Sequence, residues 1–306
     1  MSRAYSEQAR LPEGHVATIT AIAFSPKGRY LATAGLDGKI CIWDISDCHL
    51  ICVYQASSHG LSLSWVPRRE DKVLVGMANG YVVSLSFSAS VVKAHGIVIH
   101  NFPVECLAMD GTRVASGAHR ELRVWDWQAE GPWYQCAEVT EPSTESQDDQ
   151  REVLVTSVHW TKRQLVVSYL NHGIHIFDRQ RWACLRVIEV DGQIVRGHMS
   201  SDGQSLVMSN LLTRFDLYDL ISGDLIRAFG HDVGEKRAMP VKFTELDDVI
   251  VGGTTVGTMH AWDANTGRRV QTLVHSGGHC DNHTPSMFRS RAVFASRSPK
   301  DTCPRC

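Results

Sequence analysis

Pairs of an aromatic residue and an aspartate recur along this chain of 306 residues at nearly constant intervals. Each pair ends an apolar run, such as residues 40–43 in the first copy, and a degenerate copy reaches the same register at Leu85 without the aspartate. The six aromatic or apolar positions are separated by 42, 40, 52, 41 and 44 residues. This period predicts an all-β propeller of four-stranded antiparallel blades. The complete pairs are Trp43-Asp44, Trp125-Asp126, Phe177-Asp178, Tyr218-Asp219 and Trp262-Asp263.

The first unit contains every signal that one blade requires. Gly14-His15 opens it, and the apolar run 19–24 predicts its inner strand. The sequence SPKG at 25–28 predicts a tight turn, because proline presets φ and glycine accepts positive φ. Residues 30–34 and 39–43 predict the next two strands, with a turn at Asp37-Gly38 between them. This unit resembles the WD-repeat family in its GH, SPKGRYLATAG and LDGKICIWD segments, and looser copies extend the resemblance over roughly residues 14 to 275.

The resemblance implies a structural hydrogen-bond relay inside a well-formed blade. It runs from a tryptophan to a serine or threonine, then to the histidine of the GH pair and to a turn aspartate. In the first unit these positions hold Trp43, Thr33, His15 and Asp37. The chemistry is reasonable by itself, since a buried indole N–H and a buried hydroxyl each need a partner. We therefore interpret these four residues as structural and not catalytic.

The relay is incomplete in the other units. The third unit keeps Ser116 and Trp125, with His95 as its expected histidine and His119 or Arg120 near the aspartate position. The second unit has His59 but lacks the remaining partners, and units four to six lack most of the relay. Such blades are expected to depend on apolar packing. The residues that replace relay positions include Val75, Asn79, Leu85, Phe177, Tyr218, Gly252 and Val256.

The six units do not include the two ends of the chain, and these ends are expected to close the ring. We expect residues 1–306 to form a single propeller, since closed all-β folds reach this size as one domain. The resemblance implies that an N-terminal strand at 4–11 completes a seventh, irregular blade. The segment 278–306 would supply the rest of that blade, although only 291–295 reads as a strand and no aromatic–aspartate pair follows it.

The composition favours an ordinary protein interior and no strong electrostatic field. Hydrophobic residues make up 43% and charged residues 21%, with a formal net charge of −2. Nothing in this balance indicates nucleic acid as a partner. The nine cysteines have no disulfide-framework spacing, which fits a reducing compartment. No signal peptide or run of about eighteen apolar residues is evident, so the expected location is the cytoplasm or the nucleus.

The sequence contains no motif that indicates catalysis or a cofactor. Nucleophile-elbow, phosphate-loop, dinucleotide and zinc-protease motifs are all missing. The cysteines and histidines near the C-terminus are compatible with a zinc site, because a C-x-x-C turn can chelate one ion. The pair lies at the extreme end of the chain, where chains fray, so no metal is predicted. The residues concerned are His279, Cys280, His283, Cys303 and Cys306.

Two surface features have opposite charge. Residues 138–152 form an insertion with six acidic residues and one arginine, which we expect to be a disordered loop, a docking loop for a basic partner or a phosphorylation site at Ser146. Basic residues occupy the hairpins on the face away from the GH loops, and a few acidic residues lie among them. We interpret them as an ordinary solvated surface. The alternative is a surface that binds an anionic membrane or a phosphoinositide. The basic residues are Lys27, Arg29, Arg68, Arg69, Lys72, Lys162, Arg163, Arg179, Arg181, Arg268 and Arg269.

The function predicted from the sequence is a non-catalytic scaffold for protein–protein interaction, as a subunit of a larger complex. The resemblance implies that partners dock on the face that carries the GH loops. Tyrosine, tryptophan and arginine dominate interface hot spots, so large residues at the turns of this face are the candidates. An enzyme is a distant alternative. The candidate contact residues are Lys39, Tyr81, Arg120, His172 and Arg214.

Overall fold

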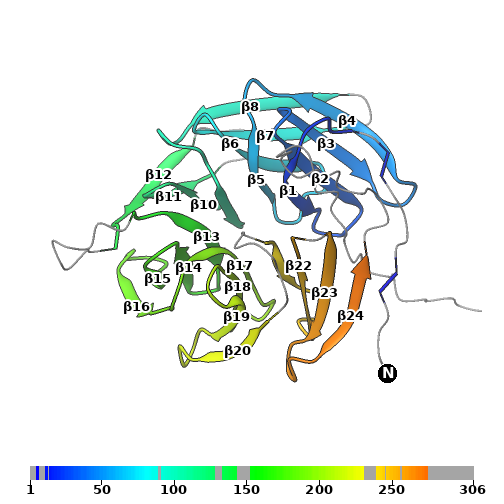
Figure 1. Cartoon of the computed structure of the whole chain (residues 1–306). Coiled ribbons are helices and arrows are strands. Elements are labelled where there is room, and N and C mark those ends of the chain that lie inside the picture. Colours follow the sequence, from blue (N-terminus) through cyan, green and yellow to red (C-terminus); the bar gives the residue numbers. More distant parts are fainter. Residues whose placement is uncertain are drawn as a thin grey trace, which may run out of the picture.

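The fold consists of six four-stranded antiparallel sheets arranged as the blades of a propeller (Figure 1). The computed structural model describes residues 5–6, 11–12, 14–88, 91–127, 133–142, 152–230, 239–244, 246–255 and 257–274. Within each blade the strands pair in sequence order, from the innermost strand to the outermost. We refer to the six sheets as blades one to six in chain order.

Blades one to three contain the first twelve strands. Blade one is β1 (Ile19–Phe24), β2 (Tyr30–Gly35), β3 (Lys39–Asp44) and β4 (His49–Gln55). Blade two is β5 (Gly60–Trp65), β6 (Lys72–Met77), β7 (Tyr81–Phe87) and β8 (Val92–Val98). Blade three is β9 (Cys106–Asp110), β10 (Arg113–Ala118), β11 (Glu121–Asp126) and β12 (Tyr134–Val139).

Blades four to six contain the second twelve. Blade four is β13 (Val155–Trp160), β14 (Gln164–Tyr169), β15 (Gly173–Asp178) and β16 (Cys184–Ile188). Blade five is β17 (Ile194–Met199), β18 (Ser205–Asn210), β19 (Arg214–Asp219) and β20 (Leu225–Phe229). Blade six is β21 (Val241–Phe243), β22 (Val249–Gly253), β23 (Thr258–Asp263) and β24 (Arg269–Val274). Each predicted unit therefore corresponds to one blade, and each aromatic position lies in a third strand.

The hydrophobic core lies between the faces of consecutive blades. Five clusters of buried side chains join blade one to two, two to three, three to four, four to five and five to six. Middle strands such as β6 are buried along their whole length because they pack on both faces, whereas the outer strand β16 is mostly exposed. This explains why the middle strands read as continuous apolar runs in the sequence.

The aromatic–aspartate pairs coincide with an irregularity in the strand pairing. In blade one the register of β3 against β4 shifts between Ile42 and Trp43, and blades three to six shift at the equivalent place. In blade two, which lacks the pair, β7 and β8 pair without a shift. The Asp44 carboxylate accepts the Ser46 N–H at 3.0 Å, so it stabilises the turn that follows the bulge.

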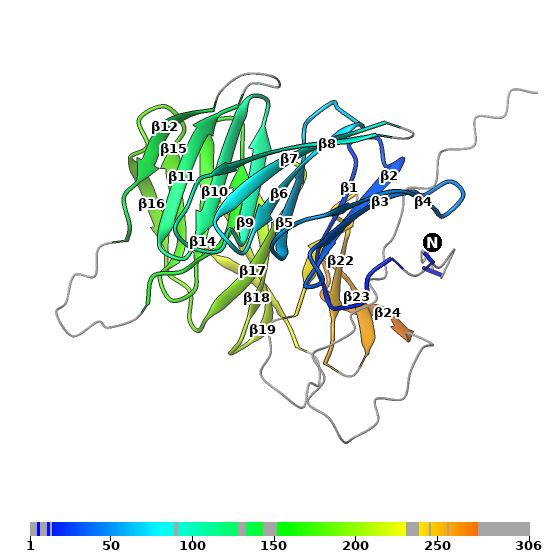
Figure 2. The ribbon, with the colours of Figure 1, turned by 90° about the horizontal axis from the view of Figure 1, so that it is seen from above.

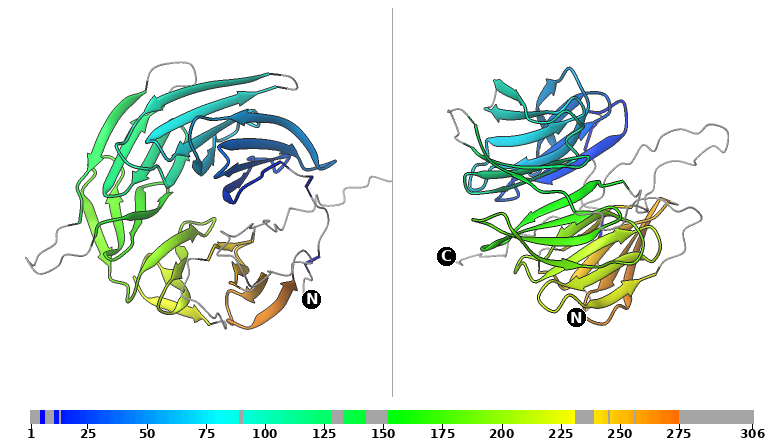
Figure 3. Two further views of the ribbon diagram at one scale, coloured as in Figure 1. Left: turned by 45° about the horizontal axis from the view of Figure 1, so that its top comes forward. Right: turned by 90° about the vertical axis from the view of Figure 1, so that its left-hand side faces the viewer.

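Blades one and six lie at the same end of the molecule when it is viewed from above (Figure 2), and the six blades follow one another around an arc (Figure 3). Tyr5 lies beside the outer strand of blade six: its N–H donates to Gln271 Oε1 at 2.6 Å, and its carbonyl accepts from Gln271 Nε2 at 2.6 Å. Leu11 packs against the face of blade one that carries Trp43. The predicted segment 278–306, with its cysteines and histidines, lies outside the described residues.

The acidic insertion connects β12 to β13. Its first two residues, Glu138 and Val139, belong to β12 and pair with Arg123 and Leu122. Residues 143–151, which include Ser146, lie outside the described part of the chain. Within the described residues no helix is long and apolar enough to cross a membrane.

Candidate interaction face

The turns between the second and third strands of all blades lie at one end of the propeller, which we call the upper face. Because all blades share the same antiparallel strand order, the connections from one blade to the next end at this face as well. The opposite end, with the turns between first and second strands and between third and fourth strands, is the lower face.

A hydrogen-bond relay connects the upper face of blade one to its interior. Trp43 Nε1 donates to Thr33 Oγ1 at 3.0 Å, and His15 Nε2 lies 2.8 Å from the same oxygen. His15 Nδ1 lies 3.0 Å from Asp37 Oδ1. Asp37 also accepts the N–H groups of Val16 and Lys39. Burial opposes ionisation of Asp37, but these hydrogen bonds outweigh it and hold the pKa of the carboxyl below its usual value.

Blade three has its own relay, built on a different histidine from the predicted one. His100 Nε2 lies 2.7 Å from Ser116 Oγ, and His100 Nδ1 lies 2.7 Å from Glu121 Oε2. The prediction of His95 is wrong: it lies in the outer strand β8, opposite Ser84. The strand extends to residue 98, so the connection that carries the histidine begins later than the spacing suggested. Burial lowers the pKa of His100 although Glu121 acts in the opposite direction.

The indole of the third blade does not join that relay. Trp125 Nε1 is buried and has no hydrogen-bond partner, whereas the equivalent Trp43 in blade one donates to Thr33. The Ser116 hydroxyl is instead 3.4 Å from the Arg123 carbonyl oxygen. An aromatic–aspartate pair in the sequence therefore does not imply that the tryptophan is hydrogen-bonded.

An aromatic strip crosses the upper face from blade two to blade three. Tyr81 begins β7 and is 38% exposed, and Phe102, in the connection to blade three, is 36% exposed. The Phe102 ring stacks on the imidazole of His119, with ring centroids 4.7 Å apart. Gly80, next to Tyr81, packs against the carbonyls of His100 and Phe102. Arg120 follows His119, and its side chain is 52% exposed.

The backbone fixes the middle of this strip. His119 has φ of 55°, in the left-handed region, and its Nε2 lies 2.6 Å from Glu152 Oε1. The stacking on Phe102 and the contact with Glu152 together hold the imidazole ring nearly parallel to the phenyl ring. We call Tyr81, Phe102, His119 and Arg120 the aromatic strip. Phe102 and His119 are further candidates that the sequence analysis does not name as contact residues, although an aromatic residue two positions after a blade's histidine was the available signal.

The other three predicted contact residues also lie at the upper face, but away from the strip. Lys39 begins β3, and its Nζ donates to the Gly14 carbonyl at 3.3 Å. The His172 carbonyl accepts from His175 Nε2 at 3.0 Å, and His172 is half-buried. Arg214 begins β19 with φ of 97° and is half-buried. The predicted positions are therefore at equivalent turns. Tyr81 and Arg120 are the two that adjoin the stacked pair, because Gly80 lies against the Phe102 carbonyl and Arg120 follows His119.

Basic residues of the lower face are largely engaged by neighbouring groups. Lys72 is buried, with its Nζ 5.5 Å from the centroid of the Trp127 ring. Glu70 links the turns of blades one and two by accepting from Ser25 Oγ at 2.6 Å and from the Lys27 N–H at 2.7 Å. Such pairing supports the interpretation of these residues as an ordinary surface. The arginine ion pairs are Arg29 with Asp44, Arg69 with Asp71 and Arg179 with Asp110.

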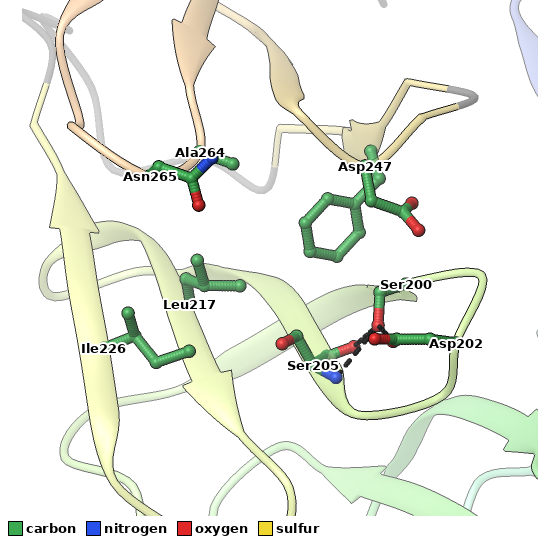
Figure 4. Close-up of a pocket in the computed structure, with 9 residues that line it drawn as sticks. Ser200, Asp202, Ser205, Leu217, Ile226, Asp247, Ala264 and Asn265 are labelled. Carbon is green, nitrogen blue, oxygen red and sulfur yellow. Dashed lines mark hydrogen bonds between the residues drawn. The ribbon is translucent and has the colours of Figure 1, made fainter.

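A hollow of about 250 Å³ opens between blades five and six on the lower face (Figure 4). Leu217 and Ile226 line one side, and Ala264 and Asn265 line the other. Its carboxylates are already engaged: Asp202 accepts from Ser200 Oγ at 2.6 Å, and Asp247 accepts the Ser201 N–H at 2.7 Å. We therefore interpret the hollow as a joint between blades. No group of three or more potential metal ligands occurs among the described residues.

Comparison with known proteins agrees with this architecture. The family "WD domain, G-beta repeat" matches residues 6–44, which include the first three strands of blade one. The chain therefore contains a WD repeat at blade one, and its other blades are similar in arrangement. WD-repeat propellers generally mediate protein interactions and are typically not enzymes.

Individual relatives match the chain at low identity. Protein tipD of Dictyostelium discoideum is 24% identical over 291 residues, which are 90% of this chain and 46% of that protein. WD repeat-containing protein 90 of Mus musculus is 29% identical over 118 residues, or 35% of this chain and 6% of that protein. Telomerase protein component 1 of Rattus norvegicus is 26% identical over 155 residues, which are 47% of this chain and 6% of that protein. The chain thus spans less than half the length of each of these relatives.

Proposed function

We propose that this protein is a non-catalytic interaction scaffold that binds protein partners on the upper face through the aromatic strip. The observation that carries the proposal is the stacked pair of Phe102 and His119 between Tyr81 and Arg120. A rigid, half-exposed aromatic surface beside an arginine loses little conformational entropy on binding and is typical of interface hot spots. Partners would extend from the strip toward Lys39, His172 and Arg214 around the same face.

The proposal includes a location in the cytoplasm or nucleus and membership of a larger complex. The lower face is the alternative contact surface, and an anionic membrane is its expected ligand. The carboxylates that pair with Arg29, Arg69 and Arg179 make that alternative less favourable, because their negative charge repels an anion at this face.

A triple variant, Tyr81→Ala, Phe102→Ala and Arg120→Ala, tests the binding face. We expect affinity purification with quantitative mass spectrometry to lose the principal partner, while the melting temperature changes little because all three side chains are partly exposed. The matched control reverses Arg68, Arg69, Arg268 and Arg269 to Glu on the lower face. If the triple variant keeps its partners and the control loses them, the upper-face proposal is wrong.

We also propose that the N-terminal segment 4–11 and the segment 278–306 close the ring as an irregular seventh blade. The contact of Gln271 with Tyr5 supports the first part. Arg227 occupies the equivalent position in blade five, and its Nη2 donates to the Asn265 carbonyl in the next blade. In blade six the next neighbour at this position is Tyr5. Gln271→Ala should therefore increase amide hydrogen exchange in the N-terminal segment, and unchanged exchange there would contradict this closure.

A further inference from the structure

Exposed carboxylates contact two of the four residues of the aromatic strip. Glu152 Oε1 lies 2.6 Å from His119 Nε2, and Glu141 Oε2 lies 3.9 Å from Arg120 Nη1. The side chain of Glu152 is 58% exposed and that of Glu141 is 43% exposed, so both are open to a partner. Glu138, near the end of β12, is 59% exposed. We call Glu138, Glu141 and Glu152 the acidic border.

The contact with His119 does not cancel the charge of Glu152. A carboxylate only accepts hydrogen bonds, so His119 donates to it through Nε2. His119 Nδ1 is buried and has no hydrogen-bond partner within the described part of the chain. A second proton on Nδ1 would be buried without an acceptor, which favours the neutral ring. Glu152 therefore keeps its full negative charge beside the stacked rings.

The arginines beside the strip do not balance its carboxylates. The pair of Arg120 and Glu141 is exposed, and an exposed pair at 3.9 Å contributes little and can change partners. Arg123 lies deeper, with its Nη2 3.4 Å from Glu121 Oε2 and 3.7 Å from Glu138 Oε1. These contacts together involve four carboxylates and two arginines, so their charge is net negative.

The exposed aromatic ring of the strip can hold a cationic side chain. His119 stacks on one face of the Phe102 ring, so the exposed part of Phe102 is its other face and its edges. The face of an aromatic ring attracts a cation, and the methylene groups of lysine and arginine pack on apolar surface. Glu152 borders the same stack, and its charge favours a cation placed there.

We propose that the aromatic strip binds a basic segment of a partner protein, in which arginine or lysine residues flank an apolar residue. One cation packs on Phe102 beside Glu152, and a second cation replaces Arg120 as the partner of Glu141. The acidic border also attracts the segment at longer range, which raises the association rate and makes it sensitive to salt. This inference rests on the proposed function, because it names the kind of partner that the strip recognises.

The double variant Glu141→Gln and Glu152→Gln tests the inference, since it removes two charges and keeps side chains of similar shape. The probe is a capped peptide of sequence RKLRK, titrated into the intact protein by calorimetry at low salt. We expect saturable binding to the parent and a loss of about fivefold in the variant, the effect of two exposed ion pairs. Added salt should weaken binding less in the variant than in the parent.

The matched control is the double variant Asp47→Asn and Asp224→Asn, which removes the same charge from exposed positions in hairpins of the lower face. It should bind the peptide like the parent, and all variants should keep the melting temperature of the parent. An equal loss in the control would show non-specific attraction and overturn the inference. Undiminished binding to the glutamine variant, equal binding of a capped EELEE peptide, or no saturable binding of the basic peptide would also overturn it.

The triple variant described above separates this inference from the proposed function. If the triple variant loses the protein partner while the basic peptide fails these tests, the strip is still the binding face and only the basic character of the partner is wrong. If the triple variant keeps its partners, the proposed function itself is wrong. Equal binding of the peptide to the triple variant and to the parent would place the basic segment away from the strip and contradict the inference.

Discussion

Blades one and two have the same strand order and pack against each other, yet they are stabilised differently. In blade one the relay of His15, Thr33 and Trp43 links β2 and β3 to the segment that precedes β1. Blade two has no such relay, its third strand contains Leu85 in place of tryptophan, and its outer pair is regular throughout. The polar relay is therefore not required for a blade to form.

The second blade compensates through contacts with its neighbours. Trp65 Nε1 donates to the Ala23 carbonyl of blade one at 2.9 Å, and Ser62 Oγ donates to the Val104 carbonyl at 2.8 Å on the way to blade three. Its middle strand β6 is buried along its full length. A degenerate unit can thus persist because the ring supplies hydrogen bonds and apolar area that the unit does not supply itself.

The largest expected effect comes from removing the turn aspartate of blade one. Asp37→Ala leaves His15 and two backbone N–H groups without their acceptor, so we expect a loss of about 3 kcal/mol in the free energy of unfolding. Asn79→Ala, at the corresponding turn of blade two, should cost less than about 1 kcal/mol because Asn79 is exposed. Urea denaturation measures both. Equal losses would show that the two blades do not differ as described.

A smaller effect should separate the tryptophans of blades one and three. Trp43→Phe removes a buried hydrogen bond to Thr33 and should cost about 1 to 2 kcal/mol. Trp125→Phe removes a buried indole N–H that has no partner. The free energy gained by removing this unsatisfied polar group should offset the free energy lost through poorer packing. Its expected change in unfolding free energy is near zero. A larger loss for Trp125→Phe than for Trp43→Phe would contradict the assigned hydrogen bonds.

The third prediction concerns the buried carboxyl of Asp216 in blade five, whose pKa is shifted in the opposite direction from that of Asp37 in blade one. Asp216 accepts from Asn210 Nδ2 at 2.8 Å and Thr213 Oγ1 at 2.6 Å, but its Oδ1 has no partner, and burial raises the pKa of this carboxyl. A raised folded-state pKa means that the folded protein binds more protons than the unfolded one. The contribution of Asp216 is therefore complete below the ordinary aspartate pKa and is lost as pH rises through the raised value.

Asp216→Asn should accordingly increase stability at neutral pH and lose that advantage in acid. Denaturation at several pH values measures the difference between variant and parent, which removes the contribution of other carboxyls. Asp202→Asn is the control with the opposite sign, because the Ser200 hydroxyl and Gln204 N–H lower the pKa of Asp202. A pH-independent difference for Asp216→Asn would show that this carboxyl has the same pKa in both states.

Much of the fold could be predicted because its signals are local. The aromatic–aspartate pairs mark third strands, since the aspartate stabilises the next turn within a few residues, as Asp178 does by accepting the Gln180 and Arg181 N–H groups. The turns that carry Tyr81 and Arg120 followed from the same periodicity. The histidine of blade three did not, because the length of β8 decides which residue reaches the relay. Because β8 extends to Val98, His95 stays in the strand and His100 is the histidine that reaches Ser116.

The sequence by itself determined the number of repeating units, the strand positions within them and the all-β class, because alternation, turn residues and capping aspartates act over short distances. The tertiary structure decided which distant residues meet. Phe102 stacks on His119 only because a blade connection crosses the neighbouring turn, and the Phe243 N–H donates to His198 Nδ1 because the innermost strands of consecutive blades are neighbours. Contacts between units depend on how whole blades pack, and no local pattern records that geometry.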